Sequence, residues 1–224
     1  MQNSRATEIV SGLTTLGALA FMVFSTCEWP SSPDRKLHTA IGKAMAREAL
    51  NLLADGGQIL VITRDTTAFR QPAADILLGS FKKEVRKAHA TIAATQLIQV
   101  DPLRPVQVPS GDFVELIRKA PSGSVIVSFM GPPLLTEEQR SQLGAIKPRI
   151  VAFCSGNLPD YVDLRALFDR QLLHAAVVSR RNSEPPPSKA KAWTGSFDQL
   201  YMTATAADHS SLPTPSGVAP KEQE

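Results

Sequence analysis

Three short runs of this sequence are apolar without alternation: QILVIT at 58–63, SVIVSFM at 124–130 and RIVAFC at 149–154. A strand with one solvated face alternates apolar and polar residues, whereas a strand covered by helices on both faces is apolar throughout. These runs therefore predict strands of a parallel sheet that lies between two layers of helices.

Helical patterns separate the strands along the chain. Apolar residues recur at helical spacing over 37–54, Pro72 suits a first helical turn, and Thr136 with Gln139 resembles a capping box. The predicted helices are 37–54, 72–90, 111–119, 136–145 and 163–171, and two further strands are predicted at 95–100 and 174–179. This alternation predicts an α/β domain over 37–181, with a doubly wound, mainly parallel, Rossmann-like sheet.

Composition excludes several classes of function. The 224 residues carry a net charge of only +3, and no basic-aromatic pattern suggests binding to nucleic acid. The two cysteines form no disulfide framework, and the histidines show no spacing typical of a metal site. No phosphate-binding glycine loop follows a strand either, and neither a metal nor a cofactor is predicted.

The N-terminal part of the chain contains an uncharged run, residues 9–26, between Arg5 and Glu28. Two interpretations compete: a buried helix of the domain, and an export signal or signal anchor, that is, an N-terminal hydrophobic helix in the membrane. The position of the run, before a linker at 28–36, favours the signal or anchor within residues 1–27. Cys27 ends the run in FSTC, which resembles a lipoprotein signal and makes this residue a lipidation candidate, although an uncleaved anchor is favoured. The domain is then expected on the periplasmic or extracytoplasmic side of a bacterial membrane.

Several sequence segments resemble the C-terminal lobe of type I periplasmic sugar-binding proteins. IGKAMAREALNLLADGGQILVIT looks like the helix and strand that open that lobe, and AADILLGSFKKEV is similar to its next helix. SVIVSFM and LRALFDRQLLHAAVVS resemble two later segments. Proteins of this family bind sugar between two lobes, and the resemblance, over about 38–181, implies one lobe here.

The positions that hold sugar in the family are altered. An Arg is usual where Ile76, Leu77 and Leu78 stand, and a polar pair is usual where the third strand ends in MGPP at 130–133. The fourth strand usually ends in an Asp, and here it is followed by SGN at 155–157. Because sugar recognition needs dense polar contacts, these changes predict a lobe with weak or no sugar binding.

The carboxyl ends of parallel strands nevertheless supply polar residues at one edge of the sheet. The candidate ligand-binding residues are Arg64, Asp65, Arg70, Asp101, Ser155 and Asn157. Arg64 could hold a carboxylate or phosphate, and the alternative, which we favour, is that Arg64 and Asp65 are ordinary solvated loop residues. Cys154 is interpreted as buried and inert, because His174 is expected at the opposite edge of the sheet, and no catalytic residue is assigned.

Two charged or aromatic segments remain. The basic run Lys82, Lys83, Arg86 and Lys87 is interpreted as a solvated helix face, with contact to anionic lipid as the alternative. Residues 182–224 read as a mostly disordered tail with an aromatic segment at 193–202, which either docks on the domain or binds a partner.

Three functions follow in order of preference. The first is a non-enzymatic, membrane-anchored exported domain with an interaction or assembly role and weak or no small-molecule binding. The second is a solute-binding component, for a sugar-like or anionic small molecule, that completes its cleft as a homodimer or with a protein partner. The third is a hydrolase or transferase that uses Asp65, Asp101 or Cys154.

Overall fold

The computed structural model describes residues 34–100, 107–143, 148–180, 197–212 and 215. The elements in chain order are α2 (Arg35–Leu52), β1 (Ile59–Arg64), α3 (Pro72–Lys87), β2 (Ile92–Ile98), α4 (Ser110–Lys119), β3 (Val125–Ser128), α5 (Glu137–Ser141), β4 (Arg149–Cys154), α6 (Leu158–Tyr161), α7 (Leu164–Asp169), β5 (Ala175–Ser179), α8 (Phe197–Leu200), β6 (Tyr201–Thr205) and the 3-10 turn η1 (His209–Ser211). The uncharged run 9–26 and Cys27 lie outside the described residues.

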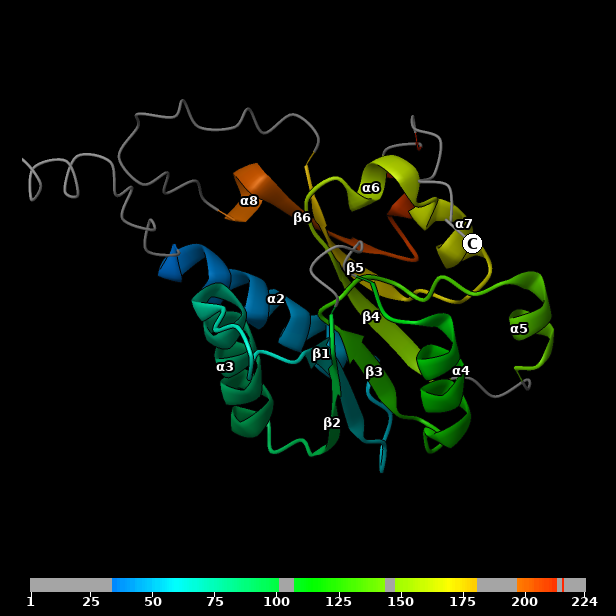
Figure 1. Ribbon diagram of the computed structural model, residues 1–224, viewed down its shortest axis with the longest axis horizontal. Coiled ribbons are helices and arrows are strands. Elements are labelled where there is room, and N and C mark those ends of the chain that lie inside the picture. Colours follow the sequence, from blue (N-terminus) through cyan, green and yellow to red (C-terminus); the bar gives the residue numbers. More distant parts are fainter. Residues whose placement is uncertain (1–33, 101–106, 144–147, 181–196, 213–214, 216–224) are drawn as a thin grey trace, which may run out of the picture. The chain divides into compact units, whose positions relative to one another are not determined.

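These strands form one six-stranded sheet in the order β2-β1-β3-β4-β5-β6. The first five strands are parallel, and β6 is antiparallel to β5 (Figure 1). The prediction of a mainly parallel α/β sheet is confirmed. The chain passes from β1 to β2 on one side and returns to β3 on the other, so the strand order reverses between β1 and β3.

Helices cover both faces of the sheet, as Figure 1 shows: α2 and α3 on one side, and α4, α5 and α7 on the other. Met45 and Phe81 share one buried cluster with Val61 of β1, and Phe113 shares the second cluster with Ile126 of β3. Strands β1, β3, β4 and β5 are therefore largely buried on both faces, which explains the unbroken apolar runs.

Local chemistry sets the helix starts. The Asp34 carboxylate accepts hydrogen bonds from the backbone nitrogens of Lys36 (2.9 Å) and Leu37 (3.0 Å), which caps α2. Thr136 caps α5, and the predicted capping box with Gln139 is confirmed.

The helices α2 and α3 pack closely at Gly42. A Cβ atom there would lie 2.3 Å from the carbonyl oxygen of Leu77, so only glycine permits this approach. The Ser80 hydroxyl donates to the carbonyls of Leu77 (2.9 Å) and Thr39 (3.2 Å), and so joins the two helices.

The tail supplies part of the sheet. Strand β6 comes from beyond residue 181, where the sequence analysis ended the domain. Tyr201 lies 5.7 Å from Phe153 between ring centroids, and Leu200 and Leu212 are buried. The described part of the aromatic segment thus docks on the domain, because its apolar side chains complete the cover of β5.

No helix within the described residues is long and apolar enough to cross a membrane.

Candidate functional site

The carboxyl ends of β1 to β5 meet at one edge of the sheet, where a doubly wound sheet receives ligands. The strands end there with Arg64, Ile98, Ser128, Cys154 and Ser179.

Arg64 and Asp65 follow β1, beside the point where the strand order reverses. Arg64 is half-buried, and its guanidinium makes no hydrogen bond or ion pair with another described residue. The Asp65 carboxylate accepts a hydrogen bond from the backbone nitrogen of Thr67 (2.9 Å). This bond, together with a hydrogen bond from the Thr67 side chain, lowers the pKa of Asp65. Asp65 therefore fixes its own turn, while Arg64 has no anionic partner among the described residues. Arg70 is exposed further along this loop.

The end of β3 is apolar and closed. Met130, Gly131, Pro132 and Pro133 are all buried, and Gly131 has a φ of +96°, which favours glycine. A Cβ atom at Gly131 would lie 3.0 Å from Cδ1 of Leu158, the first residue of α6. This helix, which the sequence did not predict, thus packs an apolar side chain against the end of β3.

The end of β4 carries the second polar pair. Ser155 and Asn157 are exposed, and the backbone nitrogen of Gly156 between them donates to the Ser179 hydroxyl (2.9 Å) at the end of β5. Cys154 is fully buried, and burial raises the pKa of its thiol. A protonated, buried thiol is a poor nucleophile.

His174 lies at the other end of β4, as predicted. Its backbone nitrogen donates to the carbonyl of Ile150 (2.9 Å), and its Nδ1 accepts from the backbone nitrogen of Ile150 (3.1 Å). Three residues of β4 lie between Ile150 and Cys154, so His174 is no base for this thiol.

The structure therefore brings the predicted residues to one edge without joining them. β3 lies between β1 and β4, so Arg64 and Ser155 stand on strands about 10 Å apart. Asp101 lies outside the described residues. Arg180 was not among the predicted residues, and its Nε donates to the carbonyl of Asp198 (2.8 Å) beside the same edge. Its place after the last predicted strand was the available signal.

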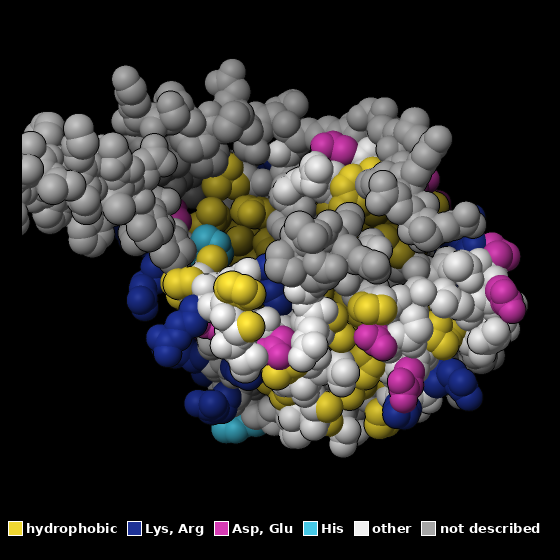
Figure 2. Space-filling model, viewed as in Figure 1, with side chains coloured by type: hydrophobic (Ala, Val, Ile, Leu, Met, Phe, Trp, Pro, Cys, Tyr) yellow, Lys and Arg dark blue, Asp and Glu magenta, His cyan; other side chains and the backbone are white. Residues whose placement is uncertain are grey.

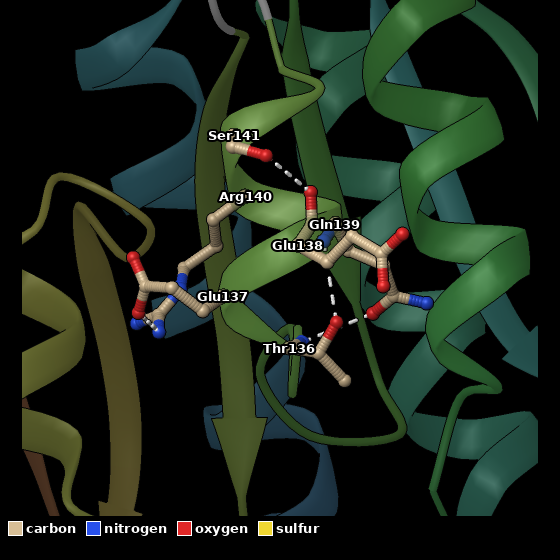
Figure 3. A network of polar contacts seen from close by, with 6 residues as sticks. All are labelled: Thr136, Glu137, Glu138, Gln139, Arg140 and Ser141. Carbon is tan, nitrogen blue, oxygen red and sulfur yellow. Dashed lines mark hydrogen bonds and ion pairs between the residues drawn. The ribbon is translucent and has the colours of Figure 1, made fainter.

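A second concave region lies between α4 and α5, with a volume of about 570 Å³. Its lining is formed by Gly111, Val114, Glu115, Arg118, Lys119, Gln139 and Gln142. Lys119 pairs with Glu115 (2.5 Å), and Gln139 donates to Ser110 (2.9 Å) while it completes the capping box shown in Figure 3. The lining therefore carries one acidic side chain, Glu115, and two basic ones, Arg118 and Lys119, and it presents mixed charge to a ligand.

The basic run forms an exposed surface on α3, where Figure 2 shows Lys and Arg side chains together. Lys83, Arg86 and Lys87 are exposed, and Lys87 pairs with Glu84 (2.9 Å). Within the described residues, no group of three His, Cys, Asp or Glu side chains could hold a metal ion.

Comparison with known proteins finds partial likenesses of fold. No family model matches the chain, and no curated protein matches it. It is similar to an arabinose-binding protein from Geobacillus stearothermophilus at 12% identity, over 82% of this chain and 64% of that one, with a TM-score of 0.45. A structure from Mycobacterium smegmatis matches at 16% identity, over 82% and 61%, with a TM-score of 0.48. A periplasmic ribose ABC transporter from Conexibacter woesei matches at 10% identity, over 63% and 45%, with a TM-score of 0.43.

Two of these three proteins are named for sugars. The chain spans between 45% and 64% of the lengths of the three. At these identities and TM-scores the likeness concerns part of the fold, and it assigns no family, ligand or activity to this chain.

Proposed function

We propose that this chain is a non-enzymatic assembly domain. It is a single lobe like those of periplasmic binding proteins, held on the extracytoplasmic side of a membrane by residues 9–26, and it joins protein partners instead of enclosing a solute. The observation that carries this proposal is the apolar closure at the end of β3, where Met130, Gly131 and Leu158 lie buried.

That closure stands beside the point where the strand order reverses, which is where an open sheet offers its ligand site. A sugar hydroxyl that loses water there would need a hydrogen-bond partner, and burying it without one is costly. The side chains of Met130, Pro132 and Leu158 offer none. The place is therefore suited to packing and not to a sugar.

A second function, binding of an anionic solute, is favoured by Arg64 alone. This half-buried cation has no ion-pair partner among the described residues. A solute long enough to span about 10 Å could contact Arg64 and also Ser155 or Asn157.

Thermal melting of the full-length chain in detergent distinguishes the two functions. The panel contains ribose, arabinose and glucose as neutral sugars, and phosphate, citrate and glucose 6-phosphate as anions. A ligand at one hundred times its Kd adds about 2.7 kcal/mol, which raises the Tm of a chain of this size by roughly 5–10 °C. We expect no such shift.

A shift with an anion that is lost in Arg64→Ala and kept in the control Arg86→Ala would establish the second function. A shift with any member of the panel would overturn the first.

The anchor is tested separately. We expect the full chain to stay in the membrane fraction after carbonate extraction, and a chain that begins at Asp34 to be soluble, since residues 34–224 form their own compact unit. Release of the full chain by carbonate would contradict anchoring.

A further inference from the structure

Strand β2 lies at one edge of the sheet and is exposed on both faces. Residues 93–97 are all exposed, and Leu97 keeps 51% of its surface accessible. Thr95 and Leu97 are paired with Val61 and Thr63 of β1, on the side of α2 and α3, so Ala94 and Gln96 face the side of α4. Neither helical layer covers β2, and in Figure 1 the strand stands between α3 and α4 with no helix in front of it.

The outer backbone groups of β2 also have no hydrogen-bond partner in the part of the chain that the structure describes. The carbonyl of Ile98 accepts from the backbone nitrogen of Asp65 (2.8 Å), so the backbone groups of Ile98 point toward β1. Successive residues of a strand point these groups to opposite sides. The N–H and C=O of Leu97 and Thr95 therefore point outward, and no described residue bonds to them there.

The strand has few of the usual protections of an edge. Natural edge strands carry charged residues, proline or bulges that prevent pairing with another chain. The sequence IAATQLI of β2 contains no charge, no proline and no glycine, and its one irregularity is a register shift at Ala93, so the strand is regular from Ala94 to Ile98. Such an edge is a template for one more strand.

We propose that β2 pairs with β2 of a second copy of this chain, antiparallel, about a two-fold axis that passes Thr95. The two sheets then form one continuous sheet. This proposal rests on the assembly function proposed above and names its partner.

The pairing is self-complementary. Across the axis Thr95 faces Thr95, Ala93 faces Leu97, and Ala94 faces Gln96, so every pair is neutral and the exposed Leu97 lies beside a small residue. The outward backbone groups of Thr95 form a hydrogen-bonded pair with those of Thr95 in the second copy, and the outward groups of Leu97 lie opposite Ala93, where the register of β2 shifts. A two-fold axis makes each of these contacts twice.

Charge and geometry favour this occupant. The basic end of α3 directly precedes β2, and antiparallel pairing separates the two basic ends by the length of the strand, roughly 20 Å. A peptide from another protein would instead be selected by pockets for alternate side chains, whereas Ala93 to Leu97 lie openly exposed.

The test measures the molar mass of the full-length chain in detergent by light scattering over a range of concentrations. We expect a dimer for the natural chain and for Thr95→Val, which keeps a neutral, β-branched residue. We expect a folded monomer for Thr95→Lys, which still unfolds cooperatively but at a Tm that no longer depends on concentration, because two lysines would stand opposite each other in the dimer.

A crosslink tests the register. In a chain with Cys27→Ser, Thr95→Cys is expected to form an intermolecular disulfide on mild oxidation, since the Cα atoms of a hydrogen-bonded pair are about 5.5 Å apart. The exposed control Thr67→Cys is expected to stay reduced.

A natural chain that is monomeric at all concentrations, or a Thr95→Lys dimer, would overturn this pairing. If either result is found and no solute raises the Tm, the assembly function stands, but the chain has a different partner. A solute shift in the melting experiment would remove the assembly function itself.

Discussion

Replacing Gly42 with alanine tests how closely α2 packs on α3. The new Cβ would lie 1.9 Å from the Ser80 hydroxyl oxygen and 2.3 Å from the Leu77 carbonyl oxygen. The hydroxyl can rotate away, but the carbonyl belongs to the backbone of α3. Because non-bonded atoms prefer separations of about 3.5 Å, the helices must move apart by about 1 Å at this point.

Two opposing effects decide the free energy of unfolding of Gly42→Ala. Alanine in a helix interior is about 1 kcal/mol more favourable than glycine. Overpacking of a tight core costs about 1–3 kcal/mol, and loss of the hydrogen bond from Ser80 to the Thr39 carbonyl costs about 1 kcal/mol more. The net destabilisation is therefore about 1–3 kcal/mol, which lowers the Tm by roughly 3–10 °C.

Gly79 is the matched control. It lies on the exposed side of α3, and no atom is within 4 Å of a Cβ built there. In Gly79→Ala only the higher helix propensity of alanine changes the free energy of unfolding, so this variant raises the Tm by about 2–4 °C. Calorimetry and urea unfolding of both variants check these values. A Gly42→Ala chain as stable as the natural one, or an equal loss in both variants, would refute the close packing of α2 on α3.

Three further predictions concern single buried groups. Leu212→Ala should lower the free energy of unfolding in urea by about 2–5 kcal/mol, because Leu212 is 0% exposed in the core; a loss below about 0.5 kcal/mol would mean that the tail is not packed there. Burial and the nearby Arg149 lower the pKa of His174. The unfolded chain therefore takes up this proton first, and stability should fall as the pH drops below about 6.5. His174→Asn should weaken this dependence in urea unfolding at pH 5.5 and 7.5, and an unchanged slope would contradict the assignment. In a Cys27→Ser chain, Cys154 should react with a thiol reagent only after unfolding, and rapid labelling of the native chain would show that it is accessible.

The ends of the strands illustrate how far the candidate site could be predicted. Arg64, Ser155 and Asn157 were placed at one edge because each directly follows an apolar run, and parallel strands end together. Their separation by β3 could not be predicted, because it depends on the order of strands in space. The packing of Leu158 against the end of β3 could not be predicted either. Leu158 begins helix α6, which has four residues and is too short to show helical periodicity in the sequence.

The sequence by itself determined the type of sheet, the presence of the main helices and the start of α5, because these depend on residues near one another in the chain. Unbroken apolar runs require cover on both faces, and Thr136 with Gln139 forms a cap within one turn. The tertiary structure alone decided which strand lies at the edge. In the sequence, β2 lies between two helical patterns, as the central strands do, yet no helix covers it in the structure. The opposite edge of the sheet is formed by β6, which comes from the C-terminal tail. Burial and strand pairing join residues that are distant in the chain, so local patterns cannot specify them.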